Sequence, residues 1–436
     1  MTITLERALR RDTGPAPTLE PVGGPGPRRG SPERTAMFAL IAAIILQPML
    51  HPAGPGNSSP VDIFTVAAIA TGAIWAFSGH HKLRAPYFIP VALMLAAGAA
   101  SGLAGPLPGA SLLTLVTDLL LFAWCTTAVN VLTAPRAMRL ALAAWSWSGI
   151  FWAGVVIVAW LGHITPLEGL NAADGNRVLF TFGDPNYAAT YWDTTIFVVY
   201  AARTPRKRWM RITGYIMLLW ALALTESNGG ALALGVGVFF LLLVRSYRKR
   251  GWAGVAATGL AIGLAVGGFF TAFPLNTIRQ WAATSNQSLL VNSIGRSAQS
   301  SSERGTLIQE TTQLYGLSDG VLGFGPASTK PLLTALLYPY ANEAHDDWLA
   351  AIVERGVVGL FGLMLLFASA AARAGPIIRR PLSARFAAAV PIPAGLVAGL
   401  LALTVNSFYE EVLHFRFLWA LLAMVAVLGK DARRDR

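Results

Sequence analysis

The sequence contains few charged residues, and this scarcity excludes several protein classes. Charged residues make up 13% of the 436 positions, whereas a soluble globular protein usually has about 25%. Hydrophobic residues make up 54% of the chain, which excludes a disordered protein. Cys125 is the single cysteine, so disulfides within the chain cannot hold the fold. The sequence has no His-Glu-x-x-His motif and no Walker motif, so ATP-driven chemistry is not expected.

Long apolar stretches recur along nearly the whole chain, and short polar segments separate them. A helix needs about 20 apolar residues to cross about 30 Å of hydrocarbon. The pattern therefore predicts an all-α polytopic membrane protein with about twelve transmembrane helices, although eleven or thirteen would also fit. The predicted spans are 35–50, 61–78, 86–104, 110–132, 140–162, 187–202, 212–225, 230–244, 253–274, 347–372, 386–406 and 415–429.

The net charge of +12 reflects where the basic residues lie. If the N-terminus is cytoplasmic, most of the 34 Lys and Arg residues fall in the two tails and in alternate loops on that side. This bias is the positive-inside rule of membrane proteins, so no nucleic-acid partner is needed to explain the charge. We expect both termini to be cytoplasmic. The basic residues outside this pattern are Arg177, Arg279, Arg296, Arg304, Lys330, Arg355 and Arg416.

Two polar segments divide the chain. Residues 1–34 are rich in Pro, Gly and Arg and predict a disordered cytoplasmic tail, and the membrane domain follows at 35–430. Residues 275–346 form the longest polar connection, on the extracytoplasmic side. A long loop in a compact fold is usually functional, so we expect this loop to carry short helices and part of the site.

Two arginines on the extracytoplasmic side are candidates for binding an anion. Arg177 precedes Asp184-Pro185-Asn186, which predicts a turn that opens the next helix. Its alternative role is to extend its side chain to water at the interface. Arg304 follows a serine cluster at 300–302, which predicts a helix cap. A guanidinium there could bind two phosphate oxygens at once, or pair with a neighbouring glutamate. The expected buried face of this helix contains Leu307, Ile308 and Leu314.

His345 is the histidine with the most acidic surroundings, because Glu343, Asp346 and Asp347 flank it where the next apolar span begins. A neighbouring carboxylate fixes the tautomer of a histidine and raises its basicity, which suits a general base that takes a proton from a hydroxyl. A metal site is less favoured, since no second histidine lies at ligand spacing. The simplest alternative is a helix-capping cluster with a solvated histidine. A second charged patch, at 410–416, could line the same mouth or pair within itself.

Three segments together resemble the O-antigen ligase and O-antigen polymerase superfamily of bacterial membrane glycosyltransferases. The first runs from Arg177 into residues 184–189, and the second joins Arg304 to Gly323-Phe324-Gly325-Pro326. The third is 344–349, which continues into 354–360. The third is the most specific, because the family places an Ala-His-Asn-like motif and a Glu-x-Gly-x-x-Gly-Leu run at the exit of its large periplasmic loop.

The resemblance implies a glycosyltransferase C-like fold in the bacterial inner membrane, surrounded by membrane lipids, with an extracytoplasmic active site. It also implies inverting, metal-independent glycan transfer, without a cofactor, from an undecaprenyl-diphosphate-linked donor to a glycan or lipid acceptor. In such an enzyme arginines hold the diphosphate and the loop histidine assists the acceptor hydroxyl. His345 is then the candidate base, and the candidate substrate-binding residues are Arg304, Arg177, Arg296, Asn186, Glu343 and Asp346.

The sequence departs from the family pattern at two places. Many relatives have Ser-Arg-Gly where this chain has Ser227-Asn228-Gly229, so Arg177 or Arg296 would have to supply the second charge. His345 is followed by Asp where Asn is commoner. These differences favour a polymerase or a divergent polysaccharide transferase over a strict lipid A-core ligase.

Two functions without glycan transfer are alternatives. A lipid-linked oligosaccharide flippase would need charges through the membrane centre, and the few candidates, Asp62, Asp118 and Asp193, disfavour it. A scaffold would use its large loop only to bind partners.

Overall fold

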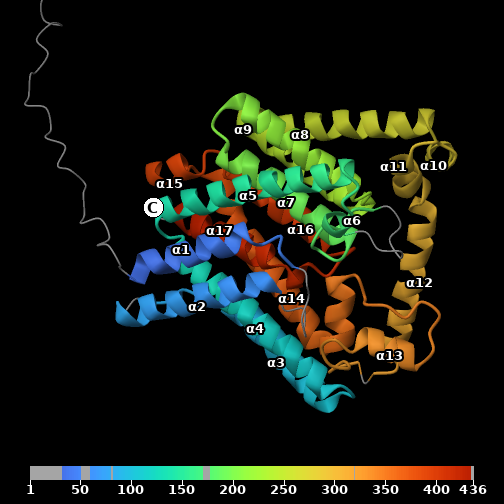
Figure 1. The fold of residues 1–436 in the computed structure, drawn as a ribbon, viewed down its shortest axis with the longest axis horizontal. Helices are drawn as coiled ribbons and strands as arrows, with labels where there is room; N and C mark the ends of the chain where they lie inside the picture. The colour runs from blue at the N-terminus through green and yellow to red at the C-terminus, as the bar shows by residue number, and fades with distance from the viewer. Residues whose placement is uncertain (1–31, 51–58, 80–81, 170–176, 319, 434–436) are drawn as a thin grey trace, which may run out of the picture.

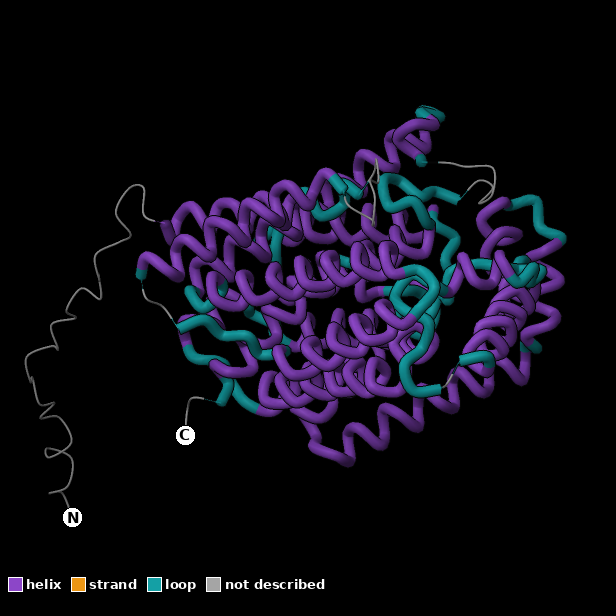
Figure 2. The backbone as a smooth tube through the Cα atoms, turned by 90° about the horizontal axis from the view of Figure 1, so that it is seen from below, coloured by secondary structure: helices purple, strands orange, loops and turns teal. Residues whose placement is uncertain are grey.

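The described part of the chain is built from helices and loops, with no strand (Figures 1 and 2). The computed structural model describes residues 32–50, 59–79, 82–169, 177–318 and 320–433. The first eight helices are α1 (Pro32–Ile45), α2 (Pro60–Ser78), α3 (Phe88–Ala104), α4 (Pro108–Val131), α5 (Pro135–Leu161), α6 (Thr165–Glu168), α7 (Pro185–Ala202) and α8 (Arg208–Leu224). The others are α9 (Asn228–Ala272), α10 (Leu275–Ala283), α11 (Ser288–Leu290), the π-helical turn η2 (Val291–Gly295), α12 (Ser297–Gly316), α13 (Thr329–Ala335), α14 (Asp347–Arg379), α15 (Ala384–Ala389), α16 (Ala394–Asn406), the 3₁₀ turn η3 (Val412–His414) and α17 (Arg416–Asp431).

Helices long and apolar enough to cross a membrane confirm the predicted class of an all-helical membrane protein. Among the described residues five helices qualify, namely α2, α4, α5, α9 and α14. The apolar helices α3 and α16 are shorter than these. Each predicted apolar stretch overlaps at least one helix, but the structure does not confirm twelve spans, and that count stays a prediction.

The long helix α9 is a helical hairpin, which accounts for two predicted spans. Its backbone leaves the helical region at Gly251, where φ is 61° and ψ is −152°. The hydroxyl groups of Ser246 and Thr258 lie 2.7 Å apart, whereas twelve residues of straight helix would separate them by about 18 Å. The two arms of α9 therefore correspond to the predicted spans 230–244 and 253–274.

The predicted span 386–406 is wrong as a single helix. The chain leaves α15 at Ala389 and re-enters a helix, α16, at Ala394. Pro391 and Pro393 lie in the break, and proline removes a backbone donor and clashes with the preceding turn. At the N-terminus α1 begins at Pro32, inside the predicted tail 1–34, and residues 1–31 lie outside the described part of the chain.

The helices of the long polar loop lie across one end of the bundle. Figure 1 shows α10, α12 and α13 along the end opposite the start of α1. Helix α17 is apolar for most of its circumference and is almost wholly buried, as expected for such a helix. It packs against α4 and α14, and α14 packs against α3. Because α14 starts at the loop and runs into this core, the loop is anchored to the centre of the bundle.

Candidate active site

A cavity of about 710 Å³ lies between the loop helices and the end of the bundle. Its walls come from the turn before α7, the start of α9, the segment from η2 into α12, and the loops at 340–345 and 409–410. Segments that are far apart in the sequence therefore meet around one space. Of the predicted site residues, the cavity brings together Arg177, Asn186, Arg296, Arg304 and His345.

His345 lies directly before the helix cap of α14. Its backbone has φ 47°, in the left-handed region that few residues other than glycine adopt. The next residue, Asp346, is the N-cap, and its carboxylate accepts hydrogen bonds from the amides of Trp348 at 2.7 Å and Leu349 at 3.0 Å. The predicted helix entrance is therefore present, and the sharp turn directs the imidazole into the cavity rather than along the helix.

The imidazole of His345 is held on both ring nitrogens. Nδ1 lies 3.2 Å from Oε2 of Glu410, whose side chain is only 3% exposed. Nε2 lies 3.3 Å from the amide nitrogen of Asn342. Because a carboxylate accepts and an amide NH₂ donates, these partners assign the proton to Nδ1 in the neutral ring. The lone pair of Nε2 then accepts from the Asn342 amide, which also lines the cavity.

The acid–base properties of this pair are set by burial and mutual charge. Burial alone would lower the pKa of His345, but the hydrogen bond and charge of Glu410 outweigh it and raise the pKa to about 9. Burial raises the pKa of Glu410 to about 7, even though His345 acts in the opposite direction. Between about pH 7 and pH 9 the pair therefore holds one titratable proton, with His345 as an imidazolium and Glu410 as a carboxylate.

Asp347 fixes the loop that carries Glu410. Its buried carboxylate accepts a hydrogen bond from the amide of Val412 at 3.0 Å, and its own amide donates to the carbonyl of Ser407 at 3.0 Å. These two bonds bracket Glu410 and tie its loop to the first turn of α14. Asp347 therefore hydrogen-bonds to the backbone of the loop at 407–412, and this places Glu410 against the imidazole of His345.

Arg304 reaches the same glutamate from the opposite wall. Its guanidinium lies 3.5 Å from Oε1 of Glu410 and 5.1 Å above the ring centroid of Tyr409. The side chain is 34% exposed. The charge partner is thus neither Glu303 nor Glu310, the neighbours on its own helix. The imidazole and the guanidinium each contact one oxygen of a single carboxylate.

The local prediction around Arg304 was only partly correct. Helix α12 begins at Ser297, so the serines at 300–302 lie inside it and do not cap it. Leu307 and Leu314 are buried as predicted, but Ile308 is 50% exposed. The helix starts earlier than expected because the preceding π-helical turn, η2, runs directly into it.

Arg177 is fixed deep in the cavity wall rather than extended to water, since it is 6% exposed. Its Nε donates to the carbonyl of Thr225 at 2.9 Å, and a terminal nitrogen donates to Oδ1 of Asn186 at 3.0 Å. The hydroxyl of Ser227 donates to the same oxygen at 2.8 Å. The predicted turn is present, because Asp184 caps α7 through the amide of Asn186.

Arg296 and the turn before α9 lie on the adjacent wall. Nε of Arg296 donates to the carbonyl of Asn292 at 3.1 Å, and the side-chain amide of Asn292 donates to Glu226 at 3.4 Å. Burial raises the pKa of Glu226. The side-chain amide of Asn228 donates to the carbonyl of Ser293 at 2.9 Å. It therefore fastens the loop to the bundle.

Two predicted site residues do not line this cavity. Asp346 serves as the helix cap described above, and Glu343 lines a second cavity of about 330 Å³. This second cavity also contains Glu411 and His414, which form an ion pair at 3.2 Å. The chain from 343 to 347 separates the two spaces, because His345 faces the larger one and Glu343 the smaller.

Glu410, Asn342 and Tyr409 are lining residues that contact His345 or Arg304 and that the sequence did not place in the site. The sequence offers the charged patch at 410–416 as a possible part of the mouth, and Glu410 does face the cavity. Its neighbour Glu411 faces the other cavity. Consecutive acidic residues between two apolar spans were the available signal, but the pattern does not say which carboxylate faces which space.

The glycine-rich motifs have a structural role. Helix α14 breaks at Gly356, where φ is 65° and a Cβ would collide with the carbonyl oxygen of Val321. The amide of Phe324 donates to the carbonyl of Val353 at 2.9 Å. The carboxylate of Glu354 accepts from Thr329 Oγ1 at 2.8 Å, at the start of α13. The Glu-x-Gly run and the Gly-Phe-Gly bend therefore clamp the loop to α14.

Two of the remaining arginines form buried ion pairs between helices. Arg355 contacts Asp118 at 2.6 Å, and Arg416 contacts Asp62 at 2.5 Å. Breaking a buried pair leaves an uncompensated charge, so these contacts hold the helices together. Within the described ranges, no group of three or more His, Cys, Asp or Glu side chains is arranged to hold a metal ion.

Comparison with known protein families gives a match over part of the chain. Residues 213–364 match a family model described as O-antigen ligase. The matched range includes the large loop with Arg304 and His345, whereas Arg177 and Glu410 lie outside it. No curated protein matches the chain. The match confirms the resemblance predicted from the sequence.

Proposed function

We propose that this protein is an extracytoplasmic glycosyltransferase, because residues 213–364 match a family model described as O-antigen ligase. It takes a glycan from an undecaprenyl-diphosphate-linked donor and transfers it to a glycan or lipid acceptor, with inversion and without a metal ion. The observation on which this rests is that Glu410 joins His345 and Arg304 across one cavity.

The arginines of the cavity bind the diphosphate. Arg304 is the most adaptable of them, because it is one-third exposed and its 3.5 Å contact with Glu410 is long for an ion pair. It can turn to phosphate oxygens with both arms of its guanidinium. Arg177 and Arg296 are anchored by backbone carbonyls and supply fixed positive charge on the adjoining walls. The prenyl chain stays in the surrounding lipid.

The transfer step uses Nε2 of His345, where the acceptor hydroxyl takes the place of the Asn342 amide as the hydrogen-bond partner. The acceptor hydroxyl attacks the anomeric carbon from the side opposite the diphosphate, and its proton moves to Nε2 of His345. The new glycosidic bond forms as the bond between sugar and diphosphate breaks, and the electron pair of that bond remains on the diphosphate. Glu410 stabilises the imidazolium that results, and Arg304 stabilises the growing negative charge of the leaving group.

The chemistry of the turn before α9 favours a polymerase or a divergent transferase within this class. Asn228 is used to fasten the loop, so the second clamping charge comes from Arg177 or Arg296. Such a rearranged clamp is expected where the acceptor differs from that of a lipid A-core ligase.

A reconstituted assay tests the proposal. Purified protein is given a lipid-linked glycan donor and an acceptor, and the products are analysed for a new glycosidic bond of inverted configuration. Activity should persist in excess chelator. Arg304→Gln should reduce turnover by about 10²–10³, the loss typical of one donor to a developing oxyanion, and Arg304→Lys should lose less because it keeps the charge.

The same assay separates the alternatives. A change in the sidedness of the lipid-linked glycan without a new bond would show a flippase and contradict the proposal. Full product formation by Arg304→Gln would remove Arg304 from the mechanism.

A further inference from the structure

A second basic region lies at the other end of the bundle from the active site. A cavity of about 410 Å³ there is lined by the loop before α3, the ends of α4 and α17, and the later part of α14. His345 precedes α14 and Arg416 begins α17, whereas the cavity residues Arg373 and Lys430 lie on the later parts of these two helices. The two sites are therefore separated by the length of the helices.

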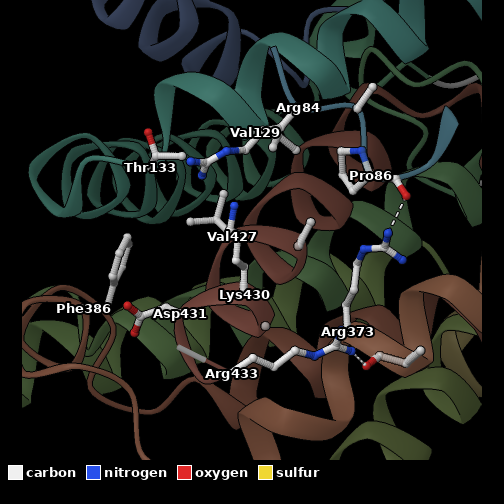
Figure 3. A pocket seen from close by; sticks show the side chains of 14 residues that line it. Arg84, Pro86, Val129, Thr133, Arg373, Phe386, Val427, Lys430, Asp431 and Arg433 are labelled. Carbon is white, nitrogen blue, oxygen red and sulfur yellow. Dashed lines mark hydrogen bonds between the residues drawn. The ribbon is translucent and has the colours of Figure 1, made fainter. Parts of the chain in front are cut away.

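The lining of this cavity combines cations with apolar surface. Figure 3 shows Arg84, Arg373, Lys430 and Arg433 around the space. Among the described residues, Asp431 is the only acidic one in the lining. Its carboxylate is occupied by the amide and hydroxyl of Ser383, both at 2.9 Å. The apolar part of the wall is formed by Val129, Phe386, Ala426 and Val427.

The two arginines on the α14 side are held in place before any ligand binds. Arg373 donates to the carbonyls of Ser369 and Pro86 and lies 4.8 Å above the ring centroid of Tyr87. Arg433 donates to the carbonyl of Ala372. Guanidinium groups fixed in this way lose little freedom when an anion arrives. An adjacent cavity of about 580 Å³ shares Arg433 and adds Arg379 and Arg380.

We propose that this cavity binds the head group of an anionic phospholipid. A phosphate fits the cations, and the apolar wall fits the first part of an acyl chain, so a ligand that combines both is better matched than a free anion. The cavity lies at the ends of membrane-length helices (α4 and α14), which is where a head group meets the hydrocarbon. The positive-inside pattern predicts this end to be cytoplasmic, and basic pockets between helices on that side suit anionic lipids.

The test uses the full-length protein in neutral detergent and three probes: phosphatidylglycerol, phosphatidylcholine of the same chain length, and inorganic phosphate. Thermal unfolding is followed as each probe is titrated. Phosphatidylglycerol should raise the unfolding midpoint of the wild type, and the other two should not. The apparent affinity for phosphatidylglycerol should fall roughly fivefold for each charge removed in the triple variant Arg84→Gln/Lys430→Gln/Arg433→Gln.

A matched variant removes the same charge elsewhere. Arg245, Lys249 and Arg250 are exposed residues of α9 outside the cavity, so Arg245→Gln/Lys249→Gln/Arg250→Gln should respond as the wild type does. If the triple cavity variant does not fold, the single Arg84→Gln, on an exposed loop residue, carries the same expectation at roughly fivefold.

Three results would overturn the proposal. They are an unchanged response in the cavity variants, an equal response to phosphatidylcholine, and an equal response to inorganic phosphate, which would show a small-anion site. None of these outcomes bears on glycan transfer, because the active site lies at the other end of the bundle.

Discussion

Two consecutive glutamates each hold a histidine, yet they belong to different cavities. Glu410 contacts His345 across 65 positions of sequence, and Glu411 contacts His414 three positions away, both at 3.2 Å. In both pairs burial alone would lower the histidine pKa, and the carboxylate raises it to about 9. The protonation of the histidine therefore does not distinguish the two pairs.

What distinguishes them is their surroundings. The Glu410 pair borders a cavity of about 710 Å³ with three arginines in its walls. The Glu411 pair borders about 330 Å³ of space, whose arginines, Arg355 and Arg416, are engaged in the buried ion pairs described above. Nδ1 of His414 is buried without a hydrogen-bond partner among the described residues. His414 also lowers the pKa of Glu411 against the effect of burial, whereas that of Glu410 is raised. An acid–base pair becomes a candidate catalyst only where a substrate and its counter-charges have room.

The largest expected effect comes from removing each histidine in turn. His345→Ala should lower turnover by about 10²–10⁴, the usual contribution of a general base, while membrane insertion is unchanged. His414→Ala should keep most of the activity, because its ring faces the smaller cavity. Turnover of both purified variants is measured with the same lipid-linked donor. Equal losses would mean that the two pairs are functionally alike, against our interpretation.

The next effect concerns the glutamates and the pH profile. If neutral His345 is the base, wild-type turnover should rise roughly fiftyfold between pH 7 and pH 9, as the neutral fraction grows toward a pKa of about 9. Glu410→Gln removes the main raising influence, so burial should lower the pKa and the profile should level off at lower pH. The maximal rate should also fall, because the ring loses the acceptor that orients it.

Glu411→Gln is the matched control for that profile. Glu411 is only a minor influence on the pKa of His345, so this variant should follow the wild-type curve closely. If the pH profile of Glu411→Gln shifted as much as that of Glu410→Gln, both carboxylates would control the titration of His345.

A smaller effect is expected from Asp347→Asn, which alters the support shared by both glutamates. The amide side chain can keep only part of the bonding to the backbone of Val412, so the loop should loosen and Glu410 should contact His345 less closely. Turnover should fall by less than in Glu410→Gln, with the same downward shift of the pH profile. A loss of turnover at constant profile would mean that Asp347 supports the fold but does not position Glu410.

The smallest effect is on stability. Both histidines have pKa values raised from 6.5 to about 9 in the folded state, so the folded state binds their protons more tightly. Their stabilisation is complete below about pH 6.5 and is lost as the pH rises to about 9. The unfolding midpoint in detergent should fall across this window. The fall should be smaller in His345→Gln and in His414→Gln, and nearly absent in the double variant.

Much of the fold could be predicted because apolar runs specify helices directly. The stretches 347–372 and 415–429 correspond to α14 and α17, and the two arms of α9 follow from two apolar runs around a basic turn. The break between α15 and α16 was not predicted, because the stretch 386–406 is almost wholly apolar and Pro391 and Pro393 were not interpreted as a helix end. The number of membrane spans also depends on how deep each helix lies in the membrane. Neither the length nor the composition of a helix determines that depth.

For the candidate site, the sequence singled out residues that line one cavity, but it did not show how they pair. His345 was found from the carboxylates beside it in sequence, yet its partner is Glu410. The adjacent acids act elsewhere, Asp346 on the helix cap and Asp347 on the amide of Val412. The local sequence shows which side chains are costly to bury. Which of them contact each other depends on how the loops pack against the helix bundle. The serine cluster before Arg304 was misread for the same reason, since η2 had already started the helix.

The left-handed backbone at His345 restricts how mutational data at this position can be interpreted. A β-branched residue such as Val or Ile is strongly disfavoured at φ 47°, so its defect would combine a misplaced main chain with a missing ring. Asn tolerates this conformation best among non-glycine residues of similar size. In a saturation library, the difference between Asn and Gly at 345 measures the side chain, and the difference between Asn and Val measures the turn.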